Sequence, residues 1–405
     1  MQRLARTFLG LVVPAALLAA HPARAADPVG VVASLPAELG PHWIWVSDAL
    51  LRRAALIDGD TGRFLGQIPA GVGIIAPLRS HDGREIYQAE TYYARGTRGE
   101  RTDRISITDA VTLAPLGEIL IPPKRSEHTS WVGGSALSDD GRFLAVFNLT
   151  PTTSLSIADV AERRFVGEVE TPGCSLVYPA GPRRFLSLCA DGTALLLALD
   201  ESGGVASKTK TQRFFEPQTD PIMEKPVRRG DEWLFVSFAG LVHVVDTSGP
   251  ELRFPQTWSL VDEAERAAEW RVGGPQNLAL HVPSGRLYAL MNQAGPDSHK
   301  HPGKVVWVFD LAQRKRVQTI DLRSPAASLV MDQTKTQPGG ALDWLFQVTL
   351  PNAGMERIVV TRDPAPLLFA ASSFPSTLQV YDATTGAHLR DISEVGIATS
   401  LLQLP

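Results

Sequence analysis

The sequence predicts an all-β protein, a seven-bladed β-propeller, because one short pattern recurs along the chain. In each copy, alternating apolar residues lead into an aspartate, a polar turn follows, and a second apolar stretch comes after the turn. The seven copies are spaced by 51, 50, 41, 46, 64 and 72 residues, and about 40–50 residues with four strands make one propeller blade. The aspartates of the seven copies are Asp58, Asp109, Asp159, Asp200, Asp246, Asp310 and Asp382.

Each part of the pattern has a structural reason. Alternation of apolar and polar residues predicts half-buried strands. Aspartate accepts hydrogen bonds from backbone amides in a tight turn, and glycine supplies the positive φ that such turns need. A second recurring motif, seen in residues 80–87, 138–144 and 283–288, is a turn with glycine that leads into another apolar strand. A β-sandwich has similar strand content, but it would not repeat at this period.

The N-terminus has the features of a secretory signal peptide. Arg3 and Arg6 precede an apolar run over residues 8–20, and Ala23-Arg24-Ala25 is a small-x-small cleavage pattern. We therefore expect residues 1–25 to be removed on export and residues 26–405 to form a single propeller domain. The apolar run is too short to span a membrane, so no membrane span is expected. In a bacterium the destination is the periplasm, which is oxidising.

The two cysteines of the chain suit such a compartment. Cys174 and Cys189 lie at the open end of a predicted strand–turn–strand unit, where their Cβ atoms come within bridging range. A disulfide closing this loop would stabilise the fold by ~3 kcal/mol. The alternative is a pair of buried free thiols. A redox-catalytic role is not expected, because the chain has no C-x-x-C motif.

Helical signals are scarce, and two excursions interrupt the repeat. Residues 260–270 are acidic at their start, as a helix N-terminus prefers, and predict a helix inserted between the fifth and sixth copies. Residues 291–303 form a polar segment that contains proline. Both are expected to be loops off the disc, where propellers carry function.

Catalytic motifs are absent from the sequence, which has no H-E-x-x-H, G-x-S-x-G or P-loop. Residues 71–76 match a dinucleotide fingerprint, but Pro77 prevents the helix that the fingerprint requires. His299 and His301 are a possible metal pair, and solvated loop histidines are the favoured alternative because no further ligands stand nearby. His243 is interpreted as a packed structural residue.

The composition excludes other classes of partner. With a net charge of −4 and a pI near 6.2, the chain shows no basic block for a nucleic acid.

The repeated aspartates are interpreted as turn formers because they recur from blade to blade. No catalytic, metal-binding or cofactor-binding residue is therefore expected in this chain. An exported propeller of this kind suggests a scaffold, or an enzyme whose site is shared with a partner.

Several segments carry a resemblance to one family. The most specific is Arg95-Gly-x-Arg98-Gly-x-Arg101-x-Asp103. This motif lies in residues 91–103, which resemble a stretch in the heavy subunits of methylamine and aromatic amine dehydrogenases. Those enzymes depend on tryptophan tryptophylquinone. The resemblance runs in order over nearly the whole chain after residue 25, and its segments are residues 91–103, 121–125, 173–192, 214–217, 263–274 and 299–310.

The resemblance implies a fold, a partner and a reaction. The family's heavy subunit is a seven-bladed propeller, and two heavy and two light subunits assemble in the periplasm. The light subunit carries the quinone, which oxidises a primary amine to an aldehyde and ammonia, and electrons then pass to a blue copper protein of the amicyanin or azurin type. This chain is accordingly expected to bind no cofactor, and Cys174 and Cys189 match the heavy-subunit disulfide of the family.

One segment departs from the family. There, an early loop of the heavy chain places an aromatic residue at the mouth of the light subunit's active site. The corresponding residues 48–58 are shorter here and hold no aromatic residue. We hypothesise that Leu50, Leu51 and Arg52 border the substrate channel instead. The alternative is that these residues form an ordinary first-blade turn.

Two other classes of function remain open from the sequence. One is a stand-alone propeller hydrolase of the lactonase type, which needs a central metal held by carboxylates with Asn or His. The other is a propeller that acts only as a binding scaffold for peptides. A small cysteine-rich reading frame encoded nearby would favour the dehydrogenase.

Overall fold

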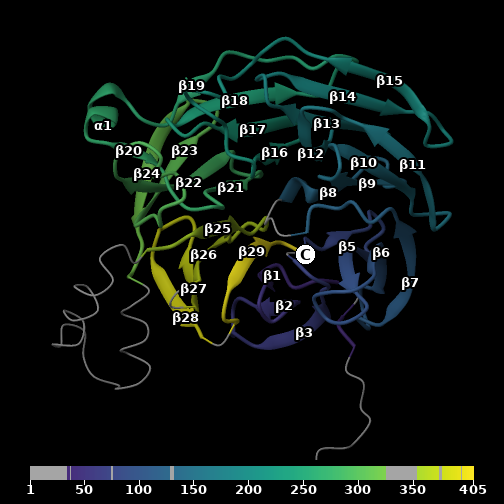
Figure 1. Cartoon of the computed structure of the whole chain (residues 1–405). Coiled ribbons are helices and arrows are strands. Elements are labelled where there is room, and N and C mark those ends of the chain that lie inside the picture. The colour runs from purple at the N-terminus through teal and green to yellow at the C-terminus, as the bar shows by residue number, and fades with distance from the viewer. Residues whose placement is uncertain are drawn as a thin grey trace, which may run out of the picture. The chain divides into compact units, whose positions relative to one another are not determined.

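The structure is a computed structural model that describes residues 34–36, 38–73, 76–127, 132–324, 354–373, 376–393 and 395–405. The described strands lie in the unit Ser34–Pro405 and form seven antiparallel sheets, which are the blades of a seven-bladed β-propeller (Figure 1). The predicted fold is therefore confirmed. The predicted signal peptide, residues 1–25, lies outside the described residues.

Each blade runs from an inner strand to an outer strand. From the inside outward, blade 1 consists of β29 (Thr399–Gln403), β1 (Trp43–Asp48), β2 (Arg53–Asp58) and β3 (Phe64–Pro69). Blade 2 consists of β4 (Leu78–Arg79), β5 (Glu85–Tyr93), β6 (Arg101–Asp109) and β7 (Pro115–Ile121). Blade 3 follows a short 3-10 turn, Val132–Gly134, and consists of β8 (Ser135–Leu137), β9 (Phe143–Asn148), β10 (Ser154–Asp159) and β11 (Arg164–Glu170).

The remaining blades follow the same order. Blade 4 consists of β12 (Cys174–Pro179), β13 (Arg184–Cys189), β14 (Ala194–Leu199) and β15 (Val205–Lys210), and blade 5 of β16 (Val227–Arg229), β17 (Glu232–Val236), β18 (Leu241–Asp246) and β19 (Trp258–Ser259). In blade 6 the inner position is divided between β20 (Trp270–Val272) and β21 (Leu278–His281), followed by β22 (Arg286–Gln293), β23 (Val305–Asp310) and β24 (Lys315–Asp321). Blade 7 consists of β25 (Arg357–Val360), β26 (Leu367–Ser373), β27 (Ser376–Asp382) and β28 (His388–Ile392).

The ring is closed by the last strand of the chain. Strand β29 pairs antiparallel with β1, with Val46 opposite Leu402 and Ser47 opposite Leu401. In Figure 1 the yellow C-terminal strand accordingly lies beside the purple N-terminal strands. Blade 1 is thus built from both ends of the described chain, and this pairing closes the ring of blades.

The seven repeated aspartates end, or directly follow, the third strand of each blade. Their carboxylates accept hydrogen bonds from backbone amides of the turn that follows, as Asp109 does from Thr112 and Asp382 does from Thr385. These backbone donors hold the pKa of Asp109, Asp246 and Asp310 below the usual range of an aspartate. The interpretation of the repeat as a turn signal is therefore confirmed for these residues.

The core lies between neighbouring blades and is made mostly by their second and third strands. All six residues of β9 and all six of β10 are buried. The second strands of four blades each contribute a fully buried phenylalanine, and apolar burial of this kind is the main favourable term of folding. These phenylalanines are Phe143, Phe185, Phe235 and Phe369.

The predicted helix is present but shorter than the sequence suggests. Helix α1 spans Glu263–Ala267, whereas the acidic segment predicted residues 260–270. Asp262 caps the helix by accepting from the amide of Glu265, whose side chain accepts from the amide of Asp262 in return. The helix ends early because Trp270 already begins β20 and pairs with Gln293 of β22.

The predicted disulfide between Cys174 and Cys189 is present. The two residues lie directly opposite each other, at the start of β12 and the end of β13, and their Cα atoms are 3.9 Å apart. Both are buried. The alternative of two free thiols is therefore wrong.

A histidine joins blade 1 to blade 7 near the ring closure. His42 Nδ1 lies 2.9 Å from a carboxylate oxygen of Asp60, and Nε2 lies 3.1 Å from Asp363 Oδ2. Burial disfavours the imidazolium, but the two carboxylates outweigh it and raise the pKa of His42 above its usual value. Arg390 also faces this group, with Nη1 3.7 Å from Asp60.

This contact predicts a pH-dependent contribution to stability. Because the pKa of His42 is raised by folding, its contribution is fully present below the pKa of the unfolded chain and is lost as the pH rises through the folded-state pKa. We expect His42→Gln to lower the free energy of unfolding by about 1 kcal/mol at pH 5 and by less at pH 9. Urea unfolding of both proteins at the two pH values measures this, and an equal loss at both would contradict it.

Candidate functional site

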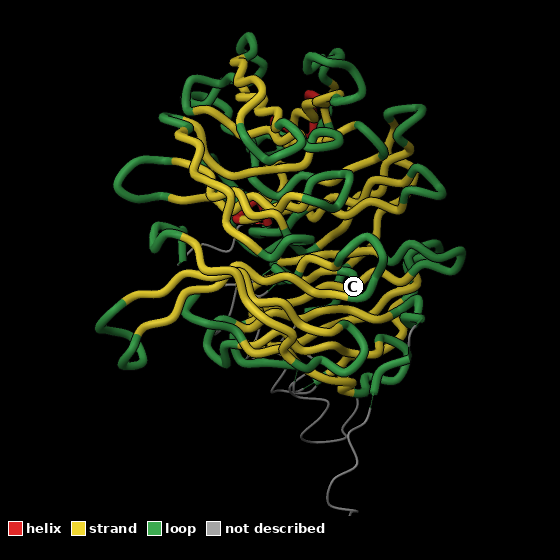
Figure 2. The backbone as a smooth tube through the Cα atoms, turned by 90° about the vertical axis from the view of Figure 1, so that its right-hand side faces the viewer, coloured by secondary structure: helices red, strands yellow, loops and turns green. Residues whose placement is uncertain are grey.

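Every segment that resembled the family reaches one face of the propeller. Strands alternate in direction within a blade, so one end of the disc carries the loops between second and third strands and the connections between blades. We call this end the upper face, and the end with the aspartate turns the lower face. Figure 2 shows the strands in yellow running between the two ends, with green loops gathered at each. The upper face is the candidate functional surface.

The most specific motif forms a long hairpin on that face. Strands β5 and β6 have nine residues each, and the tip between them, residues 94–100, is exposed. The tip turns tightly, with the amide of Arg95 donating to the carbonyl of Arg98 at 2.9 Å, and Gly96 and Gly99 have φ of 74° and 96°. Glycine adopts such angles without steric cost, which explains its place in the motif.

The base of the hairpin is fixed by a buried carboxylate. Asp103 Oδ1 accepts from Arg101 Nε and from Thr91 Oγ1, both at 2.9 Å. Asp103 Oδ2 accepts from Arg101 Nη2 at 2.8 Å and from the backbone amide of Arg125 at 2.8 Å. The carboxylate has no exposed surface, so these charged hydrogen bonds replace its hydration.

A buried arginine, Arg125, joins this cluster to the segment between blades 1 and 2. The guanidinium of Arg125 donates to Thr91 Oγ1 at 3.2 Å and to the carbonyls of Ser126 and Val72 at 3.1 Å. Burial lowers the pKa of Arg125. Two segments that resembled the family separately, residues 91–103 and 121–125, therefore fold as one unit. Their mutual contact could not be read from the sequence.

The first-blade turn presents two leucines on the upper face. Residues 49–52 connect β1 to β2, and 69% of Leu50 and 42% of Leu51 are exposed. Arg52 is also exposed and has φ of 50°. The three residues predicted to border a substrate channel thus share one tight turn, and that role stays a prediction.

Of the histidines flagged by the sequence, His299 and His243 are packed against other side chains, whereas His301 is exposed. The prediction of solvated loop histidines therefore holds for His301 and is wrong for His299. His299, in the loop between β22 and β23, stacks on Phe238 with ring centroids 3.4 Å apart, and burial lowers its pKa. His243 is buried in β18, and burial lowers its pKa as well. Among the described residues, no group of three or more His, Cys, Asp or Glu side chains is placed to hold a metal ion.

Two buried cations were missed by the sequence analysis. Lys225 lies just before β16, and its Nζ is 2.9 Å from Glu224 Oε1, while Arg357 begins β25 and pairs with Glu356. Burial lowers the pKa of both cations. The sequence signal that could have identified these cations is a motif that occurs twice, as Met-Glu-Lys at residues 223–225 and Met-Glu-Arg at residues 355–357. The two copies lead into the inner strands of blades 5 and 7.

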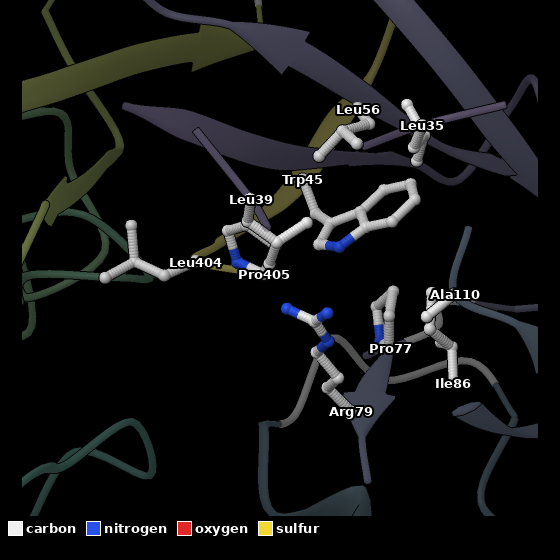
Figure 3. A pocket seen from close by; sticks show the side chains of 10 residues that line it. All are labelled: Leu35, Leu39, Trp45, Leu56, Pro77, Arg79, Ile86, Ala110, Leu404 and Pro405. Atoms are coloured by element: carbon white, nitrogen blue, oxygen red, sulfur yellow. The ribbon is translucent and has the colours of Figure 1, made fainter. Parts of the chain in front are cut away.

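An apolar pocket lies between blades 1 and 2. Figure 3 shows Trp45 and Leu56 of blade 1 facing Pro77, Ile86 and Ala110 of blade 2, with Leu404 and Pro405 at one side. The one ionisable side chain of its lining is Arg79, which donates to the carbonyl of Gly83. The pocket therefore lacks an acid–base pair.

In the part of the chain that the structure describes, no helix is long and apolar enough to cross a membrane.

The buried cluster under the hairpin gives a testable prediction. Asp103→Asn should lower the free energy of unfolding by about 3 kcal/mol, because it removes the charge of a fully buried carboxylate that accepts hydrogen bonds from Arg101 and from the amide of Arg125. Urea unfolding measures this. The matched control is Asp191→Asn, which removes an exposed partner of Lys210 and should leave stability close to that of the wild type. Equal losses in the two variants would contradict the role given to Asp103.

Comparison with known proteins agrees with this geometry. The family model of the methylamine dehydrogenase heavy chain (MADH) matches residues 47–342. The methylamine dehydrogenase heavy chain of Paracoccus versutus is 29% identical over 353 residues, covering 86% of this chain and 75% of the relative. That of Methylorubrum extorquens is 25% identical over 382 residues, covering 92% and 84%.

A solved structure of a functionally unknown protein from Desulfotomaculum acetoxidans matches with a TM-score of 0.56 at 11% identity, covering 89% of this chain and 98% of that one. This likeness shows the fold alone. The family model, in contrast, covers most of the chain, from β1 to beyond β24. The resemblance carried by the upper-face segments is thereby confirmed, and the chain belongs to the methylamine dehydrogenase heavy chain family.

Proposed function

We propose that this protein is the large subunit of a periplasmic quinoprotein amine dehydrogenase, which oxidises primary amines to an aldehyde and ammonia. The observation that carries the proposal is the family match over residues 47–342. The two heavy-chain relatives named above cover most of the chain and support it further. The buried disulfide and the signal-like N-terminus support the periplasm as its location.

The chemistry belongs to a partner in this proposal. A light subunit holds tryptophan tryptophylquinone, which accepts the electrons of the amine, and two heavy and two light subunits form the enzyme. A blue copper protein of the amicyanin or azurin type takes the electrons onward. This chain binds no cofactor and acts as the scaffold that holds the light subunit. The upper face is its docking side, because each segment that resembles the family has residues there.

Within the complex, the turn at Leu50, Leu51 and Arg52 borders the channel by which the amine enters. The support is its position on the upper face and the exposure of both leucines. An apolar wall excludes water from the channel and favours the apolar part of a substrate. A turn that borders the channel affects which amines the enzyme accepts.

Co-expression with the light subunit and its maturation factors tests the proposal as a whole. We expect this chain to co-purify with the light subunit, and the complex to show a visible quinone band that amines bleach, together with amine-dependent dye reduction. The chain purified alone should be colourless. A chain that stays monomeric and colourless in every combination would exclude the large-subunit function and return attention to a binding scaffold or a hydrolase.

Replacement of Leu51 tests the channel assignment. Leu51→Phe adds bulk to an exposed position of the turn, so it should change the ranking of kcat/KM across primary amines of increasing size. A change of roughly tenfold between the smallest and largest amines corresponds to ~1.4 kcal/mol. The same substitution at Leu120, which is 59% exposed on the outer strand β7, is the control. An unchanged ranking in Leu51→Phe would remove the turn from the channel.

A further inference from the structure

The apolar pocket between blades 1 and 2 lies at the lower face of the propeller. Strands β4 and β29 are the first strands of their blades, so they run in the same direction as the third strands, which end in the aspartate turns. Arg79 is the last residue of β4, Leu404 directly follows β29, and both line the pocket. The pocket is therefore separate from the upper face, and its ligand is a question independent of the proposed function.

The walls of the pocket are almost entirely apolar. It is a hollow of about 350 Å³ that is open to solvent, and sites for small molecules begin at roughly 300 Å³. Apart from Trp45 and Arg79, the side chains that line it are those of leucine, isoleucine, alanine and proline (Figure 3). Such walls favour the apolar part of a ligand, because contact with them removes apolar surface from water.

The guanidinium of Arg79 stands at this pocket with one edge unused. Arg79 Nε and Nη2 donate to the carbonyl of Gly83 at 3.0 Å and 2.8 Å. Among the described residues, Nη1 has no acceptor and Arg79 has no ion-pair partner. Burial lowers the pKa of Arg79, but a guanidinium remains charged at neutral pH. The outer edge, formed by Nη1 and the second hydrogen of Nη2, is thus available to an acceptor.

The carboxylate of Asp82 attracts Arg79 from the turn that follows β4, but it does not take up this edge. It accepts from Ser80 Oγ at 2.6 Å and from the amide of Arg84 at 3.1 Å. The side chain of Asp82 is also 59% exposed, so water and salt screen its attraction. The guanidinium therefore keeps most of its positive charge toward the pocket.

A second hydrogen-bond donor lines the same pocket. Trp45 is buried, and its indole N–H has no acceptor among the residues that the structure describes. Figure 3 shows the indole nitrogen on the side of the ring that is turned toward Arg79. Indole and guanidinium groups donate hydrogen bonds and cannot accept them. A ligand that meets both groups must accordingly supply acceptors, and a carboxylate supplies two oxygens together with the matching charge.

We propose that this pocket binds a small carboxylate that has an apolar body. The carboxylate accepts from the outer edge of Arg79 and from the indole N–H of Trp45, and the apolar body lies against the aliphatic walls. Charge-assisted hydrogen bonds of this kind compensate a partly desolvated guanidinium that has no counter-ion. A neutral head group lacks the charge and an ammonium head group is repelled, so the pocket selects its ligand by the head group.

Isothermal titration calorimetry of the purified chain with four probes tests the site. Hexanoate carries both parts of the ligand, hexan-1-ol replaces the charged head by a neutral one, hexylamine reverses the charge, and acetate lacks the apolar body. We expect hexanoate to bind with a Kd of roughly 1 mM, and the other three to bind about tenfold more weakly or worse. If hexanoate does not bind, or binds no better than hexan-1-ol, the proposal is wrong.

Replacement of the guanidinium tests the assignment of the head group. Arg79→Gln should remove the preference for hexanoate over hexan-1-ol. The matched control is Arg184→Gln, because Arg184 likewise donates to backbone carbonyls of a turn, those of Gly249 and Pro250, and does not line the pocket. Arg184→Gln should bind hexanoate as the wild type does, and Tm measured for both variants checks their folding. Equal affinity for hexanoate in the two variants would overturn the proposal.

A second variant keeps the test decisive if Arg79→Gln lowers the Tm. Trp45→Phe retains an aromatic ring in the wall and removes the indole donor, so it should weaken the binding of hexanoate by about threefold to tenfold. Wild-type affinity in this variant would contradict the position given to the carboxylate between the two donors.

Discussion

The pairing of β29 with β1 is the contact on which the other features depend. It supplies blade 1 with its inner strand and so converts a row of sheets into a closed ring. It also brings Asp48 next to Ile397 and His42 next to Asp363. It creates, at the junction of the first and last blades, contacts between residues that no local folding step would bring together.

Buried charges fix the upper face in place. Asp103, Arg125 and Asp48 are each almost fully buried, and each is satisfied by several charged or backbone hydrogen bonds. Burying a charged group costs desolvation energy, and its hydrogen bonds offset this cost only when the partners keep one defined geometry. The exposed loops above them, the hairpin tip and the first-blade turn, are thereby given defined positions. Because these loops are already held in place, less conformational entropy is lost when another molecule binds to them.

The sequence predicted local features well and long-range ones poorly. The aspartate turns and the disulfide were predictable because their signals lie within a few residues or within one hairpin. The helix was overestimated because its acidic start gives no information on where β20 begins. Strand β29 does not carry the repeated aspartate, so the ring closure left no mark in the pattern. The contacts of Asp48 with Ile397 and of Arg125 with Thr91 depend on closure and blade packing, and only the structure reveals them.

The division of blade 1 between the two ends of the chain has a consequence for biosynthesis. During translation the turn with Leu50 and Leu51 emerges long before the segment with Ile397. Until that segment and β29 are made, Asp48 has neither of its two distal amide donors, those of Ile397 and Ala398, and blade 1 lacks its inner strand. A chain that stops before residue 399 therefore cannot complete blade 1. The turn at residues 49–52 therefore takes its final position only after residues 397 and 398 have been synthesised.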